Sequence, residues 1–316
     1  MDTKAVVLQG PGDLSLQTVP LVPSGKDEVL VDIHHSGIST GTEKLLWTGE
    51  MPPFPGMGYP LIPGYEAMGE VAEAPAGSGF HPGNKVFVPG ASCFGEFRGL
   101  FGGAASSVAT SADRLVRLQS GTGAEGALLA LAATAQHALA GGKLPDLIVG
   151  HGVLGRLLAR LTVLHGGQPI VWETDTQRRE GSHAYDVLDP ALDAPRDHRS
   201  LRSYDCIFDA TGDASLLDTL LRHITKGGEI VLAGFYPGSV SFAFPMAFIK
   251  EARLRVAAEW SREDMEATVA LVNDGRLQLD DLITHRVPAA DAETAYPQAF
   301  SDKSCLKMIL DWRGTA

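Results

Sequence analysis

A glycine-rich turn in the middle of the chain, VGHGVLGR at 149–156, restricts the fold to few choices. It has the pattern Gly-x-Gly-x-x-Gly, directly after the apolar run DLIV and directly before a helical pattern. In such a turn the first glycine permits a tight bend, the second lets the backbone approach a pyrophosphate, and the third allows close helix–strand packing. Free N–H groups at the start of the helix then favour phosphate. The turn predicts a dinucleotide site formed by Gly150, Gly152, Val153, Leu154 and Gly155.

A carboxylate follows at the place where such a site contacts the ribose. Glu173 ends the next apolar strand, 18 residues after Gly155. A carboxylate there accepts hydrogen bonds from the ribose 2′-hydroxyl and repels a 2′-phosphate, so we predict NAD as the cofactor. Arg178 and Arg179 lie just past this strand and leave NADP open, because arginines there can hold a 2′-phosphate. Arg178 is therefore included among the predicted cofactor contacts.

Helix and strand patterns alternate from residue 126 to about residue 258. Apolar runs such as DLIVG, PIVWE, YDCIFDATG and EIVLAGF are separated by amphipathic helical segments. This alternation predicts an α/β fold with a doubly wound parallel sheet of the Rossmann type. Ligands of such sheets bind beyond the carboxyl ends of the strands. Residues that end two later strands should therefore border the nicotinamide, namely Thr211, Gly212, Gly234 and Phe235.

The chain before and after this region has a different character. Up to about residue 118, short β-like runs such as KAVVLQ, EVLVDIHHSG and NKVFVPG are punctuated by glycine and proline, which predicts a compact antiparallel β domain. The last residues hold one helix and end on the strand pattern KMILDW, which we expect to return to the first domain. The predicted organisation is a β-rich domain at 1–125, a dinucleotide domain at 126–258 and a C-terminal return at 259–316.

Composition excludes several classes of protein. The net charge of -12 argues against a nucleic-acid partner, because phosphate backbones require a basic surface. No segment approaches the roughly 18 consecutive apolar residues of a membrane span, and the N-terminus shows no apolar signal region. The three cysteines, Cys93, Cys206 and Cys305, lie far apart, which favours a reducing cytoplasm over a disulfide framework.

Three segments resemble the medium-chain dehydrogenase/reductase superfamily, and the likeness extends over essentially the whole chain. PLIPGYEAMGEV matches the segment in which other members have Gly-His-Glu, while SGISTGTEK and LALAATAQHAL match the segments that carry two further zinc ligands. The resemblance implies a GroES-like β-rich catalytic domain beside the Rossmann domain. It also places Lys307 where many members have an arginine that contacts the pyrophosphate.

The matched positions differ from the zinc enzymes in their donor atoms. Where those enzymes have Cys, His and Cys, this chain has Ser39, Tyr65 and Ala130. Serine and tyrosine are poor zinc ligands and alanine is none, so we predict no catalytic metal. The four-cysteine structural zinc lobe is missing too, since Cys93 stands alone in that region.

Two longer runs, HSGISTGTEKLLWTGEMPPFPGMGYPLIPGYEA and VFVPGASCFGEFRGLFGGAA, resemble the 3-hydroxyethyl bacteriochlorophyllide a dehydrogenase family. That family implies NAD-dependent oxidation of a 1-hydroxyethyl substituent on a chlorin-type ring to acetyl. Aromatic side chains suit a flat apolar ligand, and a cation suits its carboxylate edge. The candidate substrate contacts are Trp47, Phe54, Tyr59, Phe94 and Arg98. Alternatively, the aromatic residues seal a domain interface or a dimer contact.

Without zinc, side-chain hydrogen bonds must hold the reacting oxygen and pass its proton to water. We hypothesise that Tyr65 contacts this oxygen and that Ser39 or Thr40 completes the relay, because Tyr65 and Ser39 stand where metal ligands otherwise gather. Glu66 is expected to hold the fold. Glu43 and His137 are further candidates near the cleft.

Two rival functions remain open at this stage. One is a zinc-free quinone or enoyl reductase of the same superfamily, and the other is a non-catalytic protein that binds a dinucleotide or a pigment. The predicted partner is a small chlorin-type molecule, with no nucleic acid. The sequence leaves open a homo-oligomer and a peripheral contact with a membrane surface.

Overall fold

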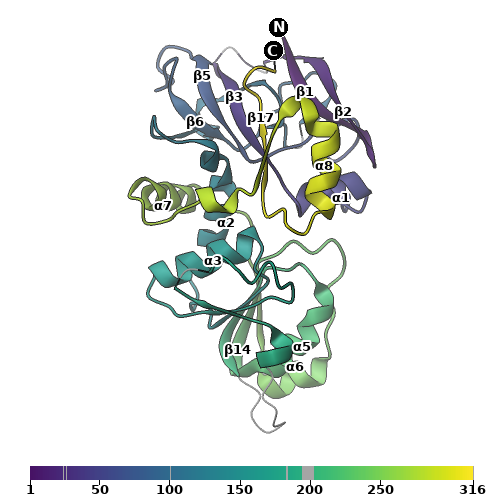
Figure 1. The fold of residues 1–316 in the computed structure, drawn as a ribbon, viewed down its shortest axis with the longest axis vertical. Helices are drawn as coiled ribbons and strands as arrows, with labels where there is room; N and C mark the ends of the chain where they lie inside the picture. The colour runs from purple at the N-terminus through teal and green to yellow at the C-terminus, as the bar shows by residue number, and fades with distance from the viewer. Residues whose placement is uncertain (24, 26, 100, 183, 194–202, 316) are drawn as a thin grey trace. The chain divides into compact units, whose positions relative to one another are not determined.

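The computed structural model describes the whole chain except residues 24, 26, 100, 183, 194–202 and 316. It forms two compact units, one made of Met1–Ala130 with Gln278–Ala316 and the other of Leu131–Leu277 (Figure 1). Helix α7 (Arg262–Asn273), expected in the C-terminal return, belongs to the second unit. A side-chain contact explains this position: His137 Nδ1 lies 2.7 Å from Asp264 Oδ2 and ties α7 to the helix that carries His137.

The first unit is built on two β-sheets. The smaller sheet has the order β2 (Asp13–Pro20), β1 (Asp2–Gly10), β4 (Leu61–Ile62), β7 (Arg98–Gly99). The larger has the order β16 (His285–Pro288), β17 (Met308–Asp311), β3 (Glu28–Ile38), β5 (Ala67–Glu73), β6 (Lys85–Val88), β9 (Val116–Arg117), and β8 (Ser107–Ser111) also pairs with β3. Strand β17 pairs antiparallel with β3, so the C-terminal strand returns to the N-terminal sheet.

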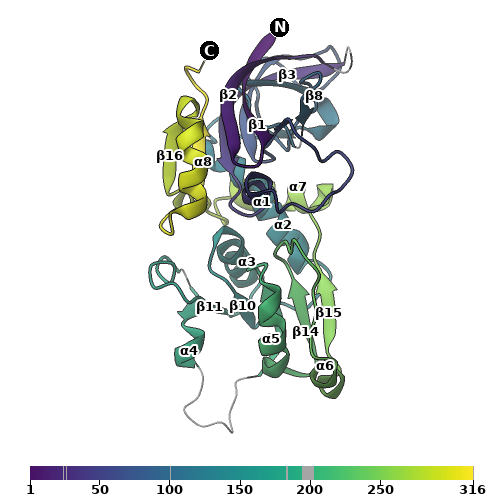
Figure 2. The ribbon, with the colours of Figure 1, turned by 90° about the vertical axis from the view of Figure 1, so that its right-hand side faces the viewer.

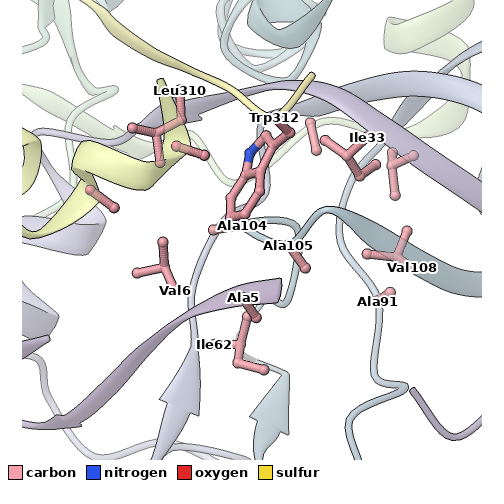
Figure 3. Packing of buried hydrophobic residues seen from close by; sticks show 14 of the residues in the cluster. Ala5, Val6, Ile33, Ile62, Ala91, Ala104, Ala105, Val108, Leu310 and Trp312 are labelled. Atoms are coloured by element: carbon pink, nitrogen blue, oxygen red, sulfur yellow. The ribbon is translucent and has the colours of Figure 1, made fainter. Parts of the chain in front are cut away.

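Alternating side chains supply the core of this unit. Along β3, Val29, Val31 and Ile33 are buried while Asp32 is exposed, the period of two expected of a half-buried strand. Trp312 belongs to the same core cluster, lies near Ile33 and is 2% exposed (Figure 3). Its indole N–H donates a 2.8 Å hydrogen bond to Ser36 Oγ, which satisfies the one polar group of this large apolar side chain.

Short helices connect these strands. The α-helices are α1 (Thr42–Thr48), α8 (Ala292–Ser301) and α2 (Leu129–Leu139), the last of which crosses the boundary between the units. The described residues also form the 3₁₀ helices η1 (Ala112–Arg114), η2 (Ala124–Leu128), η4 (Asp280–Leu282) and η5 (Ala289–Asp291), while η3 (Ala214–Leu216) belongs to the second unit. Helix α8 packs against β2, β16 and β17 (Figure 2).

A six-stranded sheet forms the second unit. Its order is β12 (Asp186–Leu188), β11 (Ile170–Trp172), β10 (Leu147–Val149), β13 (Tyr204–Asp209), β14 (Ile224–Leu232), β15 (Arg253–Val256). Every neighbouring pair is parallel. Counted along the chain, this is the strand order 3-2-1-4-5-6 of the doubly wound dinucleotide fold. The predicted α/β fold class is confirmed.

Helices join the strands of this sheet: α3 (Val153–Leu164), α4 (Pro190–Asp193), α5 (Leu217–His223) and α6 (Phe244–Lys250). Helix α3 contacts β10, and α5 and α6 contact β14. Across the described ranges of the chain, none of the helices has the length and apolarity that a bilayer crossing requires.

A buried ion pair fastens the C-terminal segment to the first unit. Lys307 Nζ lies 2.8 Å from both carboxylate oxygens of Glu66 and donates a further hydrogen bond to the carbonyl oxygen of Ile38 at 3.2 Å. The two charged side chains are 2% and 0% exposed. Lys307 precedes β17 and Glu66 precedes β5, so the pair joins segments that are distant in sequence but adjacent through the sheet.

We expect Lys307→Met to lower the free energy of unfolding by about 3–5 kcal/mol, because Glu66 would keep a buried charge without its partner. Chemical denaturation measures this loss. The double variant Glu66→Gln/Lys307→Met removes both charges and should regain most of the stability.

Lys303→Met is the matched control, since Lys303 is exposed in the same segment and its loss should change stability by less than about 0.5 kcal/mol. A double variant as unstable as Lys307→Met would show that an unpaired charge is not the cause.

Candidate active site

Tyr65 is placed by the turn that precedes β5. Gly64 has φ +102°, and a Cβ there would lie 2.7 Å from the backbone nitrogen of Ala104, so the turn requires glycine. The half-buried Tyr65 directs its hydroxyl to Ser39 Oγ at 2.8 Å. Its ring meets Phe101 edge-on, with 5.3 Å between centroids. The structure thus brings together two of the three predicted catalytic residues.

The surroundings of Tyr65 keep it protonated. Burial raises the pKa of its phenol well above the usual value, and the nearby Glu66 carboxylate raises it further. Hydrogen bonding to Ser39 and Thr42 offsets this only in part. The phenol can therefore donate and accept hydrogen bonds at neutral pH, but it does not ionise to act as a base.

Ser39 lies between β3 and α1 and is almost fully buried. Its Oγ also accepts a 3.2 Å hydrogen bond from the backbone N–H of Thr42, which fixes the hydroxyl beside Tyr65. Thr40, the alternative relay residue, is exposed, and the Tyr65 bond goes to Ser39 instead. Sequence reasoning missed Thr42, whose only signal was its place three residues after Ser39.

Further charged and phenolic groups lie behind this pair, and we call them the buried cluster. Its members are Glu43 of α1, Glu66, Lys307 and Tyr296 of α8, all at most 2% exposed. Burial raises the pKa of Glu43 to about 8, although the Tyr296 hydroxyl and Lys307 act in the opposite direction. The pKa of Tyr296 is raised by burial and by Glu43.

The donor set at the expected zinc position does not fit zinc. Ser39 Oγ is engaged with the Tyr65 hydroxyl, and Ala130, buried in α2, has no donor atom. Elsewhere among the described residues, no group of three or more His, Cys, Asp or Glu side chains is placed to hold a metal ion. Neutral hydroxyl groups are poor substitutes for the thiolate and imidazole ligands that zinc prefers.

The glycine-rich turn has the geometry of a pyrophosphate cradle. A Cβ on Gly155 would lie 1.9 Å from the carbonyl oxygen of Gly150, so the third glycine is required for the helix to approach the strand. Gly150 itself has φ +97°. At Gly152, which begins α3, a Cβ would meet nothing within 4 Å, and no side chain caps the helix. Backbone N–H groups at this end can receive phosphate oxygens.

Glu173 stands directly after β11 and is oriented by backbone donors. Its Oε2 accepts a 3.0 Å hydrogen bond from the N–H of His151, and its Oε1 accepts one of 2.9 Å from Asp175. Carboxylate oxygens have further lone pairs, so Glu173 can still accept from a ribose hydroxyl. The residues present therefore fit a nicotinamide dinucleotide at both its pyrophosphate and its adenosine ribose.

His151 was not predicted, and its only signal in sequence was its position inside the glycine motif. It is fully buried, and burial lowers its pKa to about 4, so the ring is neutral. Its Nδ1–H donates to the carbonyl oxygen of Arg178 at 2.6 Å, and its Nε2 accepts from the Tyr185 hydroxyl at 2.9 Å. The ring thus holds the loop after Glu173 against the glycine-rich turn.

The two arginines that left NADP open lie in this loop. Arg179 forms a 2.5 Å ion pair with Asp189 and a 3.0 Å hydrogen bond with Thr176, so its guanidinium is already engaged. The carbonyl oxygen of Arg178 also accepts a hydrogen bond from Arg156 at 3.0 Å. Both contacts fix the path of the loop.

Four more predicted cofactor contacts lie at the ends of β13 and β14. A Cβ on Gly212 would lie 2.5 Å from the carbonyl oxygen of Phe235, so these two loops are close together. Asp209, at the end of β13, accepts hydrogen bonds from both the N–H and the hydroxyl of Thr211, at 2.8 and 2.6 Å. A Cβ on Gly234 would lie 2.7 Å from the backbone nitrogen of Gly212.

Lys307, the remaining predicted cofactor contact, is buried against Glu66, and this position does not support the predicted pyrophosphate contact.

The predicted substrate contacts differ in how far their side chains are exposed. Trp47 and Tyr59 are half-buried, Phe54 is 37% exposed and Arg98 is exposed. Phe94 is 1% exposed and lies in the core, so its assignment as a substrate contact is corrected. Close packing against Gly102, where a Cβ would lie 2.9 Å from the Phe94 ring, draws that ring inward.

A surface hollow of about 460 Å³ lies in the second unit at α6 and β15, the last strand of its sheet as described. Its lining includes the exposed side chains of Phe244, Phe248 and Ile249. None of the predicted site residues belongs to it. An apolar patch beside a terminal strand is typical of an interaction surface.

Comparison with known proteins agrees with this geometry. Residues 25–120 match the alcohol dehydrogenase GroES-like domain. Over the full length of both chains the protein is 60% identical to 2-desacetyl-2-hydroxyethyl bacteriochlorophyllide A dehydrogenase of Cereibacter sphaeroides. Over 99% of both chains it is 58% identical to the protein of the same name from Rhodobacter capsulatus.

The fold also matches that of a dehydrogenase from Sinorhizobium meliloti solved with NADP bound. The TM-score is 0.82 at 23% sequence identity, covering 98% of this chain and 99% of the other. Together with the full-length relatives, this shows that the chain belongs to the medium-chain dehydrogenase/reductase superfamily, in the family of the 2-desacetyl-2-hydroxyethyl bacteriochlorophyllide A dehydrogenases.

Proposed function

We propose that this protein is a zinc-independent, NAD-dependent dehydrogenase acting on 3-hydroxyethyl bacteriochlorophyllide a. It oxidises the 1-hydroxyethyl group to acetyl and gives bacteriochlorophyllide a. The observation that carries the proposal is the 60% identity, over the full length of both chains, to a dehydrogenase named for this substrate. Three buried cysteines that form no disulfide are consistent with a reducing cytoplasm as the compartment.

The dinucleotide is held by the second unit. Backbone N–H groups at the start of α3 receive the pyrophosphate, and Glu173 accepts from the adenosine ribose. Bound NAD supplies the hydride acceptor. The pairing of Arg179 with Asp189 supports NAD over NADP, because that guanidinium already has a carboxylate partner.

Tyr65 and Ser39 take the place of a metal at the reacting oxygen. The neutral Tyr65 phenol hydrogen-bonds this oxygen, and Ser39 orients the phenol through their 2.8 Å contact. A hydrogen bond to the oxygen stabilises the carbonyl that forms as hydride leaves. The aromatic ring attached to the alcohol carbon eases that departure by conjugation.

The macrocycle is proposed to contact aromatic side chains in the last turn of α1 and in the segment that follows it. Trp47, Phe54 and Tyr59 offer partly exposed aromatic surface there. Arg98 lies across Gly58, where a Cβ would be 2.7 Å from its Nε, so the guanidinium lies beside this segment. A guanidinium at this place suits the carboxylate of a chlorin edge.

The direct test mixes purified protein, NAD and the hydroxyethyl substrate in the presence of a chelator. We expect a red-shifted absorption band as the acetyl group joins the ring conjugation, together with one NADH per product. Dependence of turnover on added zinc would contradict the metal-free mechanism. Pigment binding without turnover would favour the non-catalytic alternative.

Tyr65→Phe should lower kcat/KM by about 10²-fold or more, because it removes the hydrogen bond to the reacting oxygen. The phenyl ring that packs on Phe101 remains, so the thermal unfolding temperature should change little. Steady-state kinetics at a fixed pH measure the effect. Unchanged turnover would refute the role of the phenol.

Glu173→Gln should weaken NADH binding about tenfold, equivalent to about 1.4 kcal/mol, since it removes a charged acceptor for the ribose. Fluorescence titration with NADH and NADPH gives both affinities, and wild type should prefer NADH. Glu180→Gln is the control, because Glu180 is an exposed carboxylate of the same loop. Tighter NADPH binding by wild type would reverse the cofactor assignment.

A further inference from the structure

Glu43 is an anomaly in the buried cluster. It lies in the first turn of α1 and is 1% exposed. Among the described residues, neither of its carboxylate oxygens has a hydrogen-bond partner of acceptable geometry. Buried polar groups are nearly always paired, so an unpaired carboxyl group calls for an explanation.

The charges around Glu43 do not balance if every group ionises. The groups that face it are Glu66 beside β5, Lys307 beside β17 and Tyr296 of α8. Lys307 is the one cation of this cluster among the described residues, and Glu66 binds it with both oxygens. Glu43 therefore has no cation of its own, and a buried carboxylate without a partner is costly.

The cluster reaches the reacting oxygen through two hydroxyl groups. Tyr65 is the one partly exposed residue of this arrangement, since Ser39 and the four members of the buried cluster are at most 5% exposed. Its hydroxyl contacts Ser39, and Ser39 is joined to Glu43 by the first turn of α1, where the Glu43 N–H donates to the Ser39 carbonyl oxygen at 3.1 Å. Glu43 also acts electrostatically on the Tyr65 phenol.

We propose that Glu43 stores the proton that alcohol oxidation releases, receiving it from the reacting oxygen through Tyr65 and Ser39. This rests on the proposed function. The substrate C–H bond breaks and its electron pair leaves as hydride to NAD, the O–H bond breaks, and the C=O bond forms. The proton passes along the Tyr65 and Ser39 hydroxyl groups to the Glu43 carboxylate, which becomes a carboxylic acid.

Of the ionisable groups in the buried cluster, Glu43 is the one suited to accept and release a proton during the reaction. Glu66 is held as a carboxylate by Lys307. Burial keeps the pKa of both Tyr65 and Tyr296 above their usual range, so these phenols stay neutral. The pKa of Glu43, about 8, lies where a proton acceptor works near neutral pH.

The test is the pH profile of kcat/KM for oxidation. In wild type the rate should rise with pH and level off above about 8, because only ionised Glu43 accepts a proton. Glu43→Gln keeps the shape of the protonated side chain but cannot accept a proton. We expect its rate at pH 9 to fall about 10²-fold and the rise near pH 8 to disappear.

Glu50→Gln is the matched control, since Glu50 is an exposed carboxylate just past the end of α1. It should keep the wild-type profile. A Glu43→Gln variant with the wild-type rate and the same rise near pH 8 would overturn the proposal.

Unfolding gives a second readout that does not depend on turnover. The pKa of Glu43 is raised from 4.5 to about 8 in the folded state, so the folded chain binds the extra proton between these values. Its stabilising contribution is complete below about pH 4.5 and is lost as pH rises to about 8. Glu43→Gln should lack this loss, and its stability relative to wild type should therefore increase with pH.

The two readouts separate the possible failures. If wild type shows no NAD-dependent oxidation, the proposed function fails, and without that oxidation there is no released proton for Glu43 to store. If turnover is normal but Glu43→Gln unfolds with the same pH dependence as wild type, Glu43 holds no proton in the neutral range and the present inference fails.

Discussion

The buried cluster of the first unit holds two carboxyl groups, Glu43 and Glu66, but a single ammonium group, Lys307. This imbalance of charge determines the protonation states of the groups around the candidate active site. Lys307 satisfies Glu66 through two 2.8 Å contacts and leaves Glu43 without a cation. In a medium of low polarity, such a cluster is most stable with a single negative charge, so one carboxyl group keeps its proton. The same carboxylates disfavour ionisation of Tyr65. The chemistry available to the site therefore follows from a charge balance that also fastens the C-terminal segment.

The proposed zinc-free mechanism depends on this balance of charges. A metal ion would hold an alkoxide by its own charge, whereas a neutral phenol can only share a proton with the oxygen. Ser39 and Tyr65 contact one another at the place where other members gather metal ligands. Since a phenol with a raised pKa is not a base, the proton must pass on to another group. In the proposed mechanism, the reaction therefore depends on the proton acceptor behind the Tyr65 and Ser39 hydroxyl groups as much as on these hydroxyl groups themselves.

Local patterns predicted the fold well, because they depend on neighbours in sequence. The turn at Gly150–Gly155 and the apolar strands of the second unit follow from spacing alone. Contacts across long distances did not follow. Glu66 and Lys307 are separated by 241 positions, and the pairing of β17 with β3 and of β3 with β5 brings them together. Phe94 likewise packs so closely against Gly102 that a Cβ there would lie 2.9 Å from its ring, a contact that residue type alone does not specify.

In the candidate cofactor site, a residue that the sequence did not single out, His151, fixes the orientation of a residue that it did, Glu173. Glu173 was evident from sequence, but its orientation is fixed by the backbone of His151 and by the loop that His151 holds. A neutral, buried imidazole suits this role, because it can donate at one nitrogen and accept at the other without adding charge near the phosphate turn. Orientation before binding reduces the entropy lost when the ribose is recognised. Under the proposed NAD assignment, the discrimination between a ribose hydroxyl and a phosphate rests on a carboxylate that is oriented from inside the glycine motif.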